Sequence, residues 1–174
     1  PVGFFDMFVS IELGLIQAAN ISFLIFAAFS CLFLMEKTGS IDATIALMVN
    51  KTKKNPQFST GIIIVLMILL SVWGSTGTLS YEEIMAFSPI FVALSLALGY
   101  DALVGVGISV VPVGVGFASA TMNPFTIGVA QTIAELPLFS GLAYRIVILV
   151  VMTAFAIWYV LRYAKKVKKD PESS

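Results

Sequence analysis

The sequence has no histidine and one cysteine, Cys31, among its 174 residues. Histidine and cysteine are the usual protein ligands of zinc and haem iron, so their scarcity argues against a zinc or haem centre. A single cysteine cannot form a disulfide within the chain. No Ser/His or Cys/His pair is available for nucleophilic catalysis, which argues against an enzyme, and any proton transfer must involve carboxylates.

Charge is scarce as well: charged residues make up 11% of the chain and hydrophobic residues 59%, with a formal net charge of zero. Soluble domains contain about 25% charged and roughly 45–50% apolar residues. This composition, with its apolar runs of near-membrane length, predicts an integral membrane protein whose main partner is the lipid bilayer. The sequence contains no glycine-rich phosphate-binding motif, and we expect neither a nucleic-acid partner nor a bound cofactor.

The apolar runs predict a single all-α membrane domain with five elements. These are a transmembrane helix over 14–36, an interfacial helix over 41–52, a hairpin over 58–98, a broken transmembrane helix over 102–137 and a last transmembrane helix over 142–163. The chain begins with Pro1 and shows no signal-peptide region, which indicates a piece of a longer protein.

The cations set the expected orientation of these helices. Lysines cluster on the loop over 50–57, and further cations crowd the C-terminal end, at Arg162, Lys165, Lys166, Lys168 and Lys169. Because positively charged segments stay on the cytoplasmic side, both regions are predicted to be cytoplasmic. The expected location is the cytoplasmic (inner) membrane of a bacterium, crossed several times.

The hairpin over 58–98 has two interpretations. It is either a re-entrant hairpin whose tip stops inside the bilayer or a pair of full crossings, and both return the chain to the cytoplasm. The apolar run 58–73 would span about 24 Å as a helix, short of a hydrocarbon core of about 30 Å. We therefore favour the re-entrant hairpin.

Two polar breaks interrupt the apolar sequence. GSTGTLS carries the hydroxyls of Ser75, Thr76 and Thr78, and SATMNPFT carries Ser119, Thr121, Asn123 and Thr126. Non-helical backbone at membrane depth persists only where protein or a water-filled cavity satisfies its polar groups. Broken helices of this kind form the substrate and ion sites of secondary transporters. These seven residues are therefore candidate binding residues for substrate or a coupling ion, although Asn123 before a proline is also a good helix N-cap.

Two adjacent glutamates follow the first break. Ser80 and Glu83 match a capping box, in which Glu83 would bond back to the start of its own helix. Glu82 has no such structural explanation, and an intramembrane carboxylate is a functional candidate. We expect Glu82 to act as counter-ion to a substrate ammonium or as carrier of a coupling proton, with Glu83 either capping or sharing that role.

The charge around the breaks predicts the sign of the substrate. Residues 55–144 contain no lysine or arginine, yet they include four acidic residues. A cavity built from this stretch would be electronegative and would favour a cation or a protonation cycle. We expect Na⁺ or H⁺ as the coupling ion, and no transition-metal site.

Several blocks resemble one transporter family. GSTGTLSYEEIMAFSPI, ALGYDALVGVGI and, above all, ATMNPFTIGVAQTIAELPLFSGLAYRI with the tail RYAKKVKKDP are similar to the YfcC family of proposed basic amino acid antiporters. That family is grouped with the anaerobic C4-dicarboxylate carriers in the ion transporter superfamily. The resemblance implies two inverted repeats that work by alternating access, each with a re-entrant hairpin and a discontinuous helix.

Under this resemblance the chain supplies one repeat, the N-terminal one. The remaining partners would be a small charged metabolite, the second repeat of the same polypeptide and a second copy in a homodimer. Better-known superfamily members carry a Ser-Asn-Thr type motif at the hairpin tip, whereas Gly74 to Thr78 lack the asparagine. Because of this difference, the sodium site of those superfamily members is not carried over directly to the tip of this hairpin.

The sequence therefore predicts part of a secondary active transporter, with basic amino acid antiport as the preferred activity. Within the transport class the alternative is Na⁺- or H⁺-coupled transport of a C4-dicarboxylate or another carboxylate. From a different class, the alternative is a non-transporting structural or channel-like membrane subunit whose polar breaks serve helix association.

Overall fold

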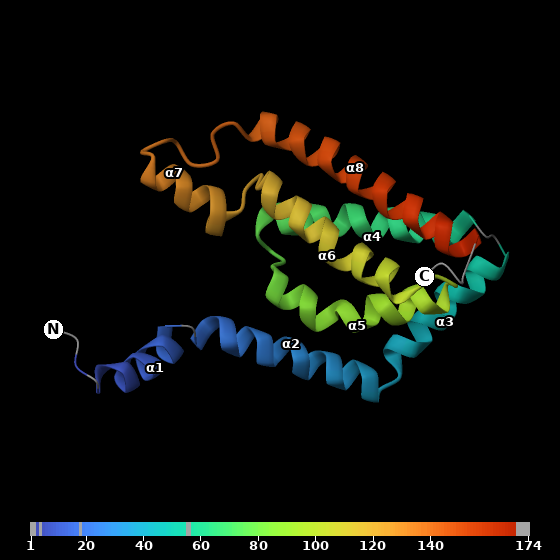
Figure 1. Ribbon diagram of the computed structural model, residues 1–174, viewed down its shortest axis with the longest axis horizontal. Coiled ribbons are helices and arrows are strands. Elements are labelled where there is room, and N and C mark those ends of the chain that lie inside the picture. Colours follow the sequence, from blue (N-terminus) through green and yellow to red (C-terminus); the bar gives the residue numbers. More distant parts are fainter. Residues whose placement is uncertain (1–2, 4, 18, 55–56, 170–174) are drawn as a thin grey trace.

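The computed structural model describes residues 3, 5–17, 19–54 and 57–169, and within these ranges the chain is entirely helical, with no β-strand (Figure 1). The helices are α1 Asp6–Gln17, α2 Ala19–Lys37, α3 Ser40–Lys54, α4 Gln57–Thr76, α5 Tyr81–Ala97, α6 Ala102–Ser119, the π-helical turn η1 Pro124–Gly128, α7 Val129–Ile133 and α8 Leu142–Lys169. Three described segments are long and apolar enough to cross a membrane: Gln57–Thr76, Ala102–Ile133 and Leu142–Lys169.

The predicted elements can be placed on these helices. Range 14–36 covers the end of α1 and most of α2, and 41–52 lies within α3. Range 58–98 covers α4 and α5, and 102–137 covers α6, η1, α7 and the turn that follows. Range 142–163 lies within α8, which continues to Lys169.

Helix α4 is longer than the apolar run that suggested it. It begins at Gln57, continues past Trp73 to Thr76 and reaches 20 residues, which corresponds to about 30 Å at 1.5 Å per residue. This equals the hydrocarbon thickness of a typical bilayer. Helix length therefore does not distinguish a re-entrant hairpin from two crossings, and any distinction must come from the packing of the hairpin tip.

Helix α6 lies at the centre of the bundle, packed against α4, α5 and α8, while α2 lies on the far side of α5 (Figure 1). The main core joins Ile63 and Met67 of α4, Val104 and Ile108 of α6, and Val160 of α8.

Glycines of α6 allow the backbones to approach closely. A Cβ on Gly105 would lie 2.6 Å from Val92 Cα of α5, and one on Gly116 would lie 2.4 Å from the Ser71 carbonyl oxygen of α4. No side chain fits at either position, so α6 is held between the two arms of the hairpin. Small residues at helix interfaces are the usual basis of such packing in membranes.

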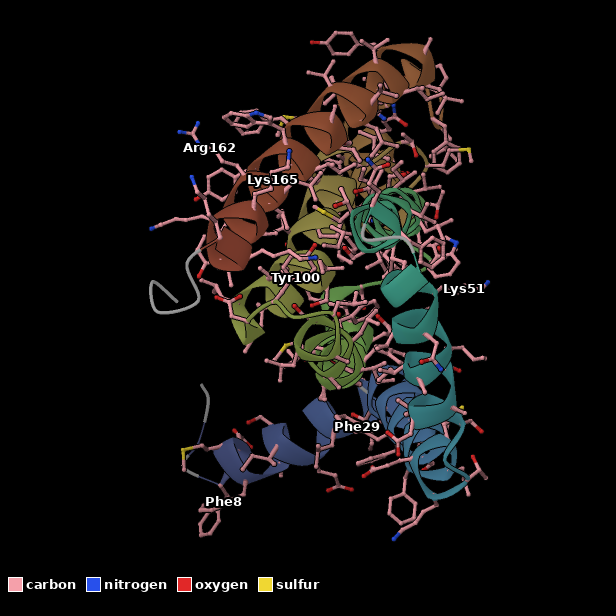
Figure 2. The ribbon with its side chains drawn as sticks, turned by 90° about the vertical axis from the view of Figure 1, so that its right-hand side faces the viewer. Phe8, Phe29, Lys51, Tyr100, Arg162 and Lys165 are labelled. Atoms are coloured by element: carbon pink, nitrogen blue, oxygen red, sulfur yellow. The ribbon has the colours of Figure 1, made fainter. Side chains whose placement is uncertain are left out.

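The open end of the hairpin is joined to α8 by polar and aromatic contacts. Asp101 caps α6 by accepting from Val104 N at 2.8 Å, and it also accepts from the Tyr163 hydroxyl at 2.7 Å. Tyr100, in the centre of Figure 2, is buried, and its hydroxyl lies 3.2 Å from Ser59 Oγ. Lys168 Nζ lies 5.0 Å from the Tyr100 ring. These contacts define the hairpin base.

Candidate functional site

The two polar breaks predicted from the sequence meet in space. One is the turn over 77–80 that connects α4 to α5, and the other is the segment 120–123 between α6 and η1. Ser75 Oγ lies 3.0 Å from Thr121 Oγ1, and the Ser75 carbonyl accepts from Thr121 Oγ1 at 3.2 Å. The same carbonyl accepts from Met122 N at 3.2 Å. We call this contact between α4 and the α6–η1 break the tip junction.

Asn123 completes the tip junction from the other side. Its side chain is fully buried, and its Nδ2 donates to the Gly74 carbonyl at 3.4 Å. Its Oδ1 accepts from Phe125 N at 2.9 Å, which caps η1. Asn123 therefore performs the predicted capping and also ties η1 to the end of α4.

The backbone of the break has unusual conformations. Gly77 has φ +76°, and a Cβ there would lie 2.9 Å from Asn123 Oδ1, so only glycine fits both the turn and the contact. Ala120 ends α6 with φ 41°, a left-handed conformation that is unfavourable for a residue with a side chain. Gly128 N donates to the Asn123 carbonyl at 3.1 Å, which closes a π-helical turn. Such turns occur frequently at functional sites.

Thr76 and Thr78 close the end of α4. The two hydroxyls lie 3.0 Å apart, and both donate to the Trp73 carbonyl, at 3.0 and 3.1 Å. Thr78 is exposed and Thr76 is partly buried. Hydroxyl and carbonyl oxygens like these, and like those of Ser75 and Thr121, are the ligand type that hard cations such as Na⁺ prefer over transition metals.

The two glutamates differ in their surroundings. Glu83 Oε2 accepts from Ser80 N at 2.8 Å and from the Ser80 hydroxyl, so Glu83 caps α5, as the capping-box interpretation predicts. Glu82, on the first turn of the same helix, is exposed. The Glu82 carboxylate also lies within interaction range of the Ser80 hydroxyl and of its own backbone amide, but it is the more exposed of the two.

The other candidates lie around the tip junction without joining it. Ser119 is buried and donates to the Val115 carbonyl of its own helix at 2.8 Å. Thr126, on η1, is exposed. The structure thus brings Ser75, Thr121 and Asn123 into one contact and leaves Ser119 and Thr126 outside it.

Sequence reasoning missed the backbone contribution to this site. Gly74 accepts from Asn123, and a Cβ on Gly74 would lie 2.9 Å from the Val113 carbonyl oxygen of α6. The sequence does contain a related feature, because Gly74 and Gly116 each lie close to a polar break. In the structure the two glycines lie on facing helices. Helix spacing alone did not indicate that the two glycines face each other.

Gln131 stabilises the outer turn and takes no part in the tip junction. It is buried, its Nε2 donates to the Ser140 carbonyl at 2.9 Å, and its Oε1 accepts from Phe139 N at 2.5 Å. These bonds hold the segment 137–141 against α7.

The electrostatics of the tip junction come from helix ends and not from side-chain cations. The C-termini of α4 and α6 and the N-termini of α5 and η1 converge there, and residues 55–144 contribute no lysine or arginine. Helix C-termini carry partial negative charge and helix N-termini partial positive charge. Among the described residues no group of three or more His, Cys, Asp or Glu side chains could hold a metal ion.

Comparison with known proteins places the chain among membrane carriers. Residues 2–174 match the family model described as C4-dicarboxylate anaerobic carrier. An uncharacterized protein of Haemophilus influenzae (strain Rd) is 36% identical over 172 residues, which is 99% of this chain and 33% of that protein. A protein of Escherichia coli strain K12 named "Putative basic amino acid antiporter YfcC" is 38% identical over 135 residues, 78% of this chain and 26% of that protein. The chain thus spans about a third or less of the length of these relatives, and no solved structure matches it.

Proposed function

The chain belongs to the C4-dicarboxylate anaerobic carrier family, and from this premise we propose that it forms part of a secondary active transporter for a small charged metabolite. The tip junction is the proposed binding region. It combines interrupted backbone, buried hydroxyls and converging helix ends in a chain whose described residues include three membrane-capable segments. In transporters this combination forms the substrate and ion sites near the centre of the membrane.

In this proposal the α4–α5 hairpin is re-entrant. Its tip bonds to the break in the α6–α7 segment, and that segment continues past the tip as η1 and α7 (Figure 1). The segment Ala102–Ile133 has 32 residues, of which α6 supplies 18 before the break. If this segment crosses the bilayer, a tip bonded at its interruption lies within the membrane and not in the outer loop region.

The preferred substrate is a basic amino acid. The ninety residues from 55 to 144 hold no cation that could neutralise a carboxylate substrate, whereas Glu82 extends an exposed carboxylate from the first turn of α5 beside the tip. In the proposal Glu82 is the counter-ion of the substrate ammonium or carries a coupling proton, and Glu83 keeps its capping role. If the transporter does not work by exchange of two substrates, Na⁺ or H⁺ would be the coupling ion.

The remaining roles follow from the geometry of the tip junction. Ser75, Thr121 and Asn123 would order the two breaks, and Thr76 and Thr78 would offer oxygens to an ion or the substrate at the tip. Ser119 and Thr126 would contribute only after the break rearranges, because one is bonded within its helix and the other points outward.

A second candidate is transport of a C4-dicarboxylate coupled to Na⁺ or H⁺. The family description favours it, and so does Arg145 at the start of α8. Arg145 Nη1 is buried and finds no hydrogen-bond partner among the described residues. A buried guanidinium nitrogen without a partner is costly and suited to an anion.

Counterflow in proteoliposomes made from the full-length protein tests the function. Vesicles loaded with unlabelled arginine should take up labelled arginine, and Glu82→Gln should reduce this uptake at least tenfold. Uptake of labelled succinate but not arginine would establish the second candidate. Uptake of neither, from protein that is folded and inserted, would support the non-transporting subunit. Protein-free vesicles serve as the blank.

Cysteine labelling tests the hairpin separately. In a Cys31→Ser background, Thr78→Cys lies at the tip and Ala97→Cys at the open end, and both side-chain positions are exposed. A membrane-impermeant maleimide added from outside should label Thr78→Cys only in substrate-free, outward-open protein. Free labelling in every transport state would indicate two full crossings.

A further inference from the structure

The cations of the chain are gathered at one end of the molecule. The sequence has ten lysines and arginines, and all except Lys37 and Arg145 belong to the ends of α3 and α8. The eight are Lys51, Lys53, Lys54, Arg162, Lys165, Lys166, Lys168 and Lys169. Figure 2 shows Lys51 on one side of the molecule and Arg162 and Lys165 on the other, with Tyr100 between them.

Four of the cations of α8 lie on a single face of that helix. Its buried positions are Leu149, Thr153, Ala156, Val160, Ala164 and Val167, which define the face packed on the bundle. Arg162, Lys165, Lys166 and Lys169 recur at intervals of three and four residues, on the opposite face, and all four are exposed. We call these four residues the α8 stripe.

The α8 stripe continues an apolar, aromatic surface. Phe155 and Trp158 precede it on the same face, are exposed, and have ring centroids 5.6 Å apart. The Arg162 guanidinium lies 5.5 Å from the Trp158 ring centroid. Going along α8, the outward face therefore changes from hydrocarbon-compatible to aromatic to cationic, which is the order of layers from the bilayer core to the headgroups.

Within the described part of the chain, no carboxylate neutralises the α8 stripe. Asp101, the acidic residue that contacts α8, accepts from Tyr163, which lies on a different face. No ion pair connects any of the four cations to another described residue. Four exposed cations in the last two turns of a membrane helix leave a positive surface that no described side chain neutralises.

We propose that the α8 stripe binds the headgroups of anionic phospholipids. Charge complementarity identifies the partner, and the continuity of the stripe with the exposed aromatic surface places its cations at headgroup depth. Arg162 offers a planar guanidinium that bonds phosphate in two places, and the lysines add point charges at the same level. Clusters of four to eight cations next to a membrane helix are typical binding sites for anionic lipid headgroups.

Trp158 provides a local probe of this site. Full-length protein is placed in phosphatidylcholine vesicles that contain brominated phosphatidylglycerol or brominated phosphatidylcholine, and the signal of the Trp158→Phe variant is subtracted. Brominated phosphatidylglycerol should quench Trp158 at a mole fraction at least three times lower than brominated phosphatidylcholine does. Raising the salt from 50 mM to 500 mM should reduce this preference, because screening weakens exposed charge contacts.

Matched variants assign the preference to the α8 stripe. Arg162→Gln/Lys165→Gln/Lys166→Gln should remove it, whereas Arg162→Lys/Lys165→Arg/Lys166→Arg should keep it. Lys37→Gln, at the end of α2, should have no effect. Equal quenching by the two brominated lipids would overturn the proposal, as would a preference that survives the triple Gln variant. Loss of the preference in 10 mM inorganic phosphate at constant ionic strength would instead identify a site for free phosphate.

Discussion

The two ends of the α4–α5 hairpin are held by different chemistry. At the tip junction the contacts are uncharged: a hydroxyl pair between Ser75 and Thr121 at 3.0 Å and an amide of Asn123 at 3.4 Å from a carbonyl. Neighbouring backbone is left-handed at Ala120. These contacts are long or neutral, and they join the last turn of α4 to the segment that follows α6.

At the hairpin base the contacts involve charge and large aromatic side chains. The Tyr163 hydroxyl donates to Asp101 at 2.7 Å, and Lys168 lies over the ring of buried Tyr100. The base also belongs to the main hydrophobic core, which includes Tyr100 and Val160. Charged hydrogen bonds are shorter and roughly twice as strong as neutral ones.

This difference indicates where the hairpin can move at least cost. The base fixes α4, α5 and α8 to one another, whereas the tip junction can separate by breaking a few neutral bonds and releasing backbone strain. A transporter needs a site that rearranges on a rigid support. The comparison therefore predicts that damage at the tip junction alters binding, and that damage at the base alters stability alone.

The largest effect is expected from placing a side chain at Gly116, where α6 and α4 approach each other closely below the tip. In Gly116→Val the new side chain would meet the Ser71 carbonyl oxygen and Ser75 N, at 2.4 and 2.7 Å from the Cβ, and backbone atoms cannot move aside easily. We expect a loss of about 3 kcal/mol or more in unfolding free energy and no measurable transport.

Gly61→Ala, on the facing helix α4, is the control, because nothing lies within 4 Å of a Cβ at Gly61. This variant should keep its transport and its thermal unfolding in detergent, or gain slightly from better helix propensity. If Gly116→Val unfolds at the same temperature as Gly61→Ala, α4 and α6 do not pack as closely as the structure indicates.

The next effect is expected at Asn123. Asn123→Ala removes the cap of η1 and the bond to Gly74, and it should cost about 2 kcal/mol. Asn123→Asp keeps an acceptor for Phe125 N but loses the donor to the Gly74 carbonyl. Both should weaken substrate affinity, measured by isothermal titration, and Asn123→Asp should retain more of the thermal stability. An Asp variant with unaltered affinity would show that the bond to Gly74 has no part in the site.

A smaller effect, limited to stability, is expected at the base. Tyr100→Phe removes the hydroxyl 3.2 Å from Ser59 Oγ but keeps the ring beside Lys168. The expected cost is about 1 kcal/mol, seen in thermal unfolding, with the same substrate KM in counterflow. Tyr144→Phe is the control, because Tyr144 is exposed. A changed KM for Tyr100→Phe would remove the distinction between base and tip.

Much of the helical framework could be predicted because its boundaries have local causes. The all-helical class follows from composition, and Asp101 and Glu83 cap their helices with the spacing that the sequence shows. The resemblance to the YfcC family and the anaerobic carriers is confirmed by the family match and by 38% identity to the Escherichia coli protein.

The rest depends on contacts between distant residues. The polar sequence GSTGTLS over 74–80 predicted a break directly after the apolar run 58–73, yet α4 continues to Thr76, where Gly74 packs on Val113 of α6. The pairing of Ser75 with Thr121 joins residues 46 positions apart. Sequence periodicity cannot identify such a pair, because both residues lie at helix ends where the helical repeat stops.

The smallest expected effect tests whether the tip junction stores strain. Ala120 has φ 41° and ψ 60° at the end of α6, and a left-handed residue with a side chain is disfavoured by about 1–2 kcal/mol. Ala120→Gly should therefore raise the unfolding free energy by about 0.5 kcal/mol, since glycine also loses more chain entropy on folding. Ala118→Gly, two residues earlier inside α6, should instead lower it by about 1 kcal/mol. Thermal unfolding of the two variants side by side gives the signs. Changes of opposite sign in the unfolding free energy would mean that the bonds of Ser75 and Asn123 hold the break under strain. Equal losses would mean that the left-handed turn is unstrained and that the tip junction is as rigid as the base.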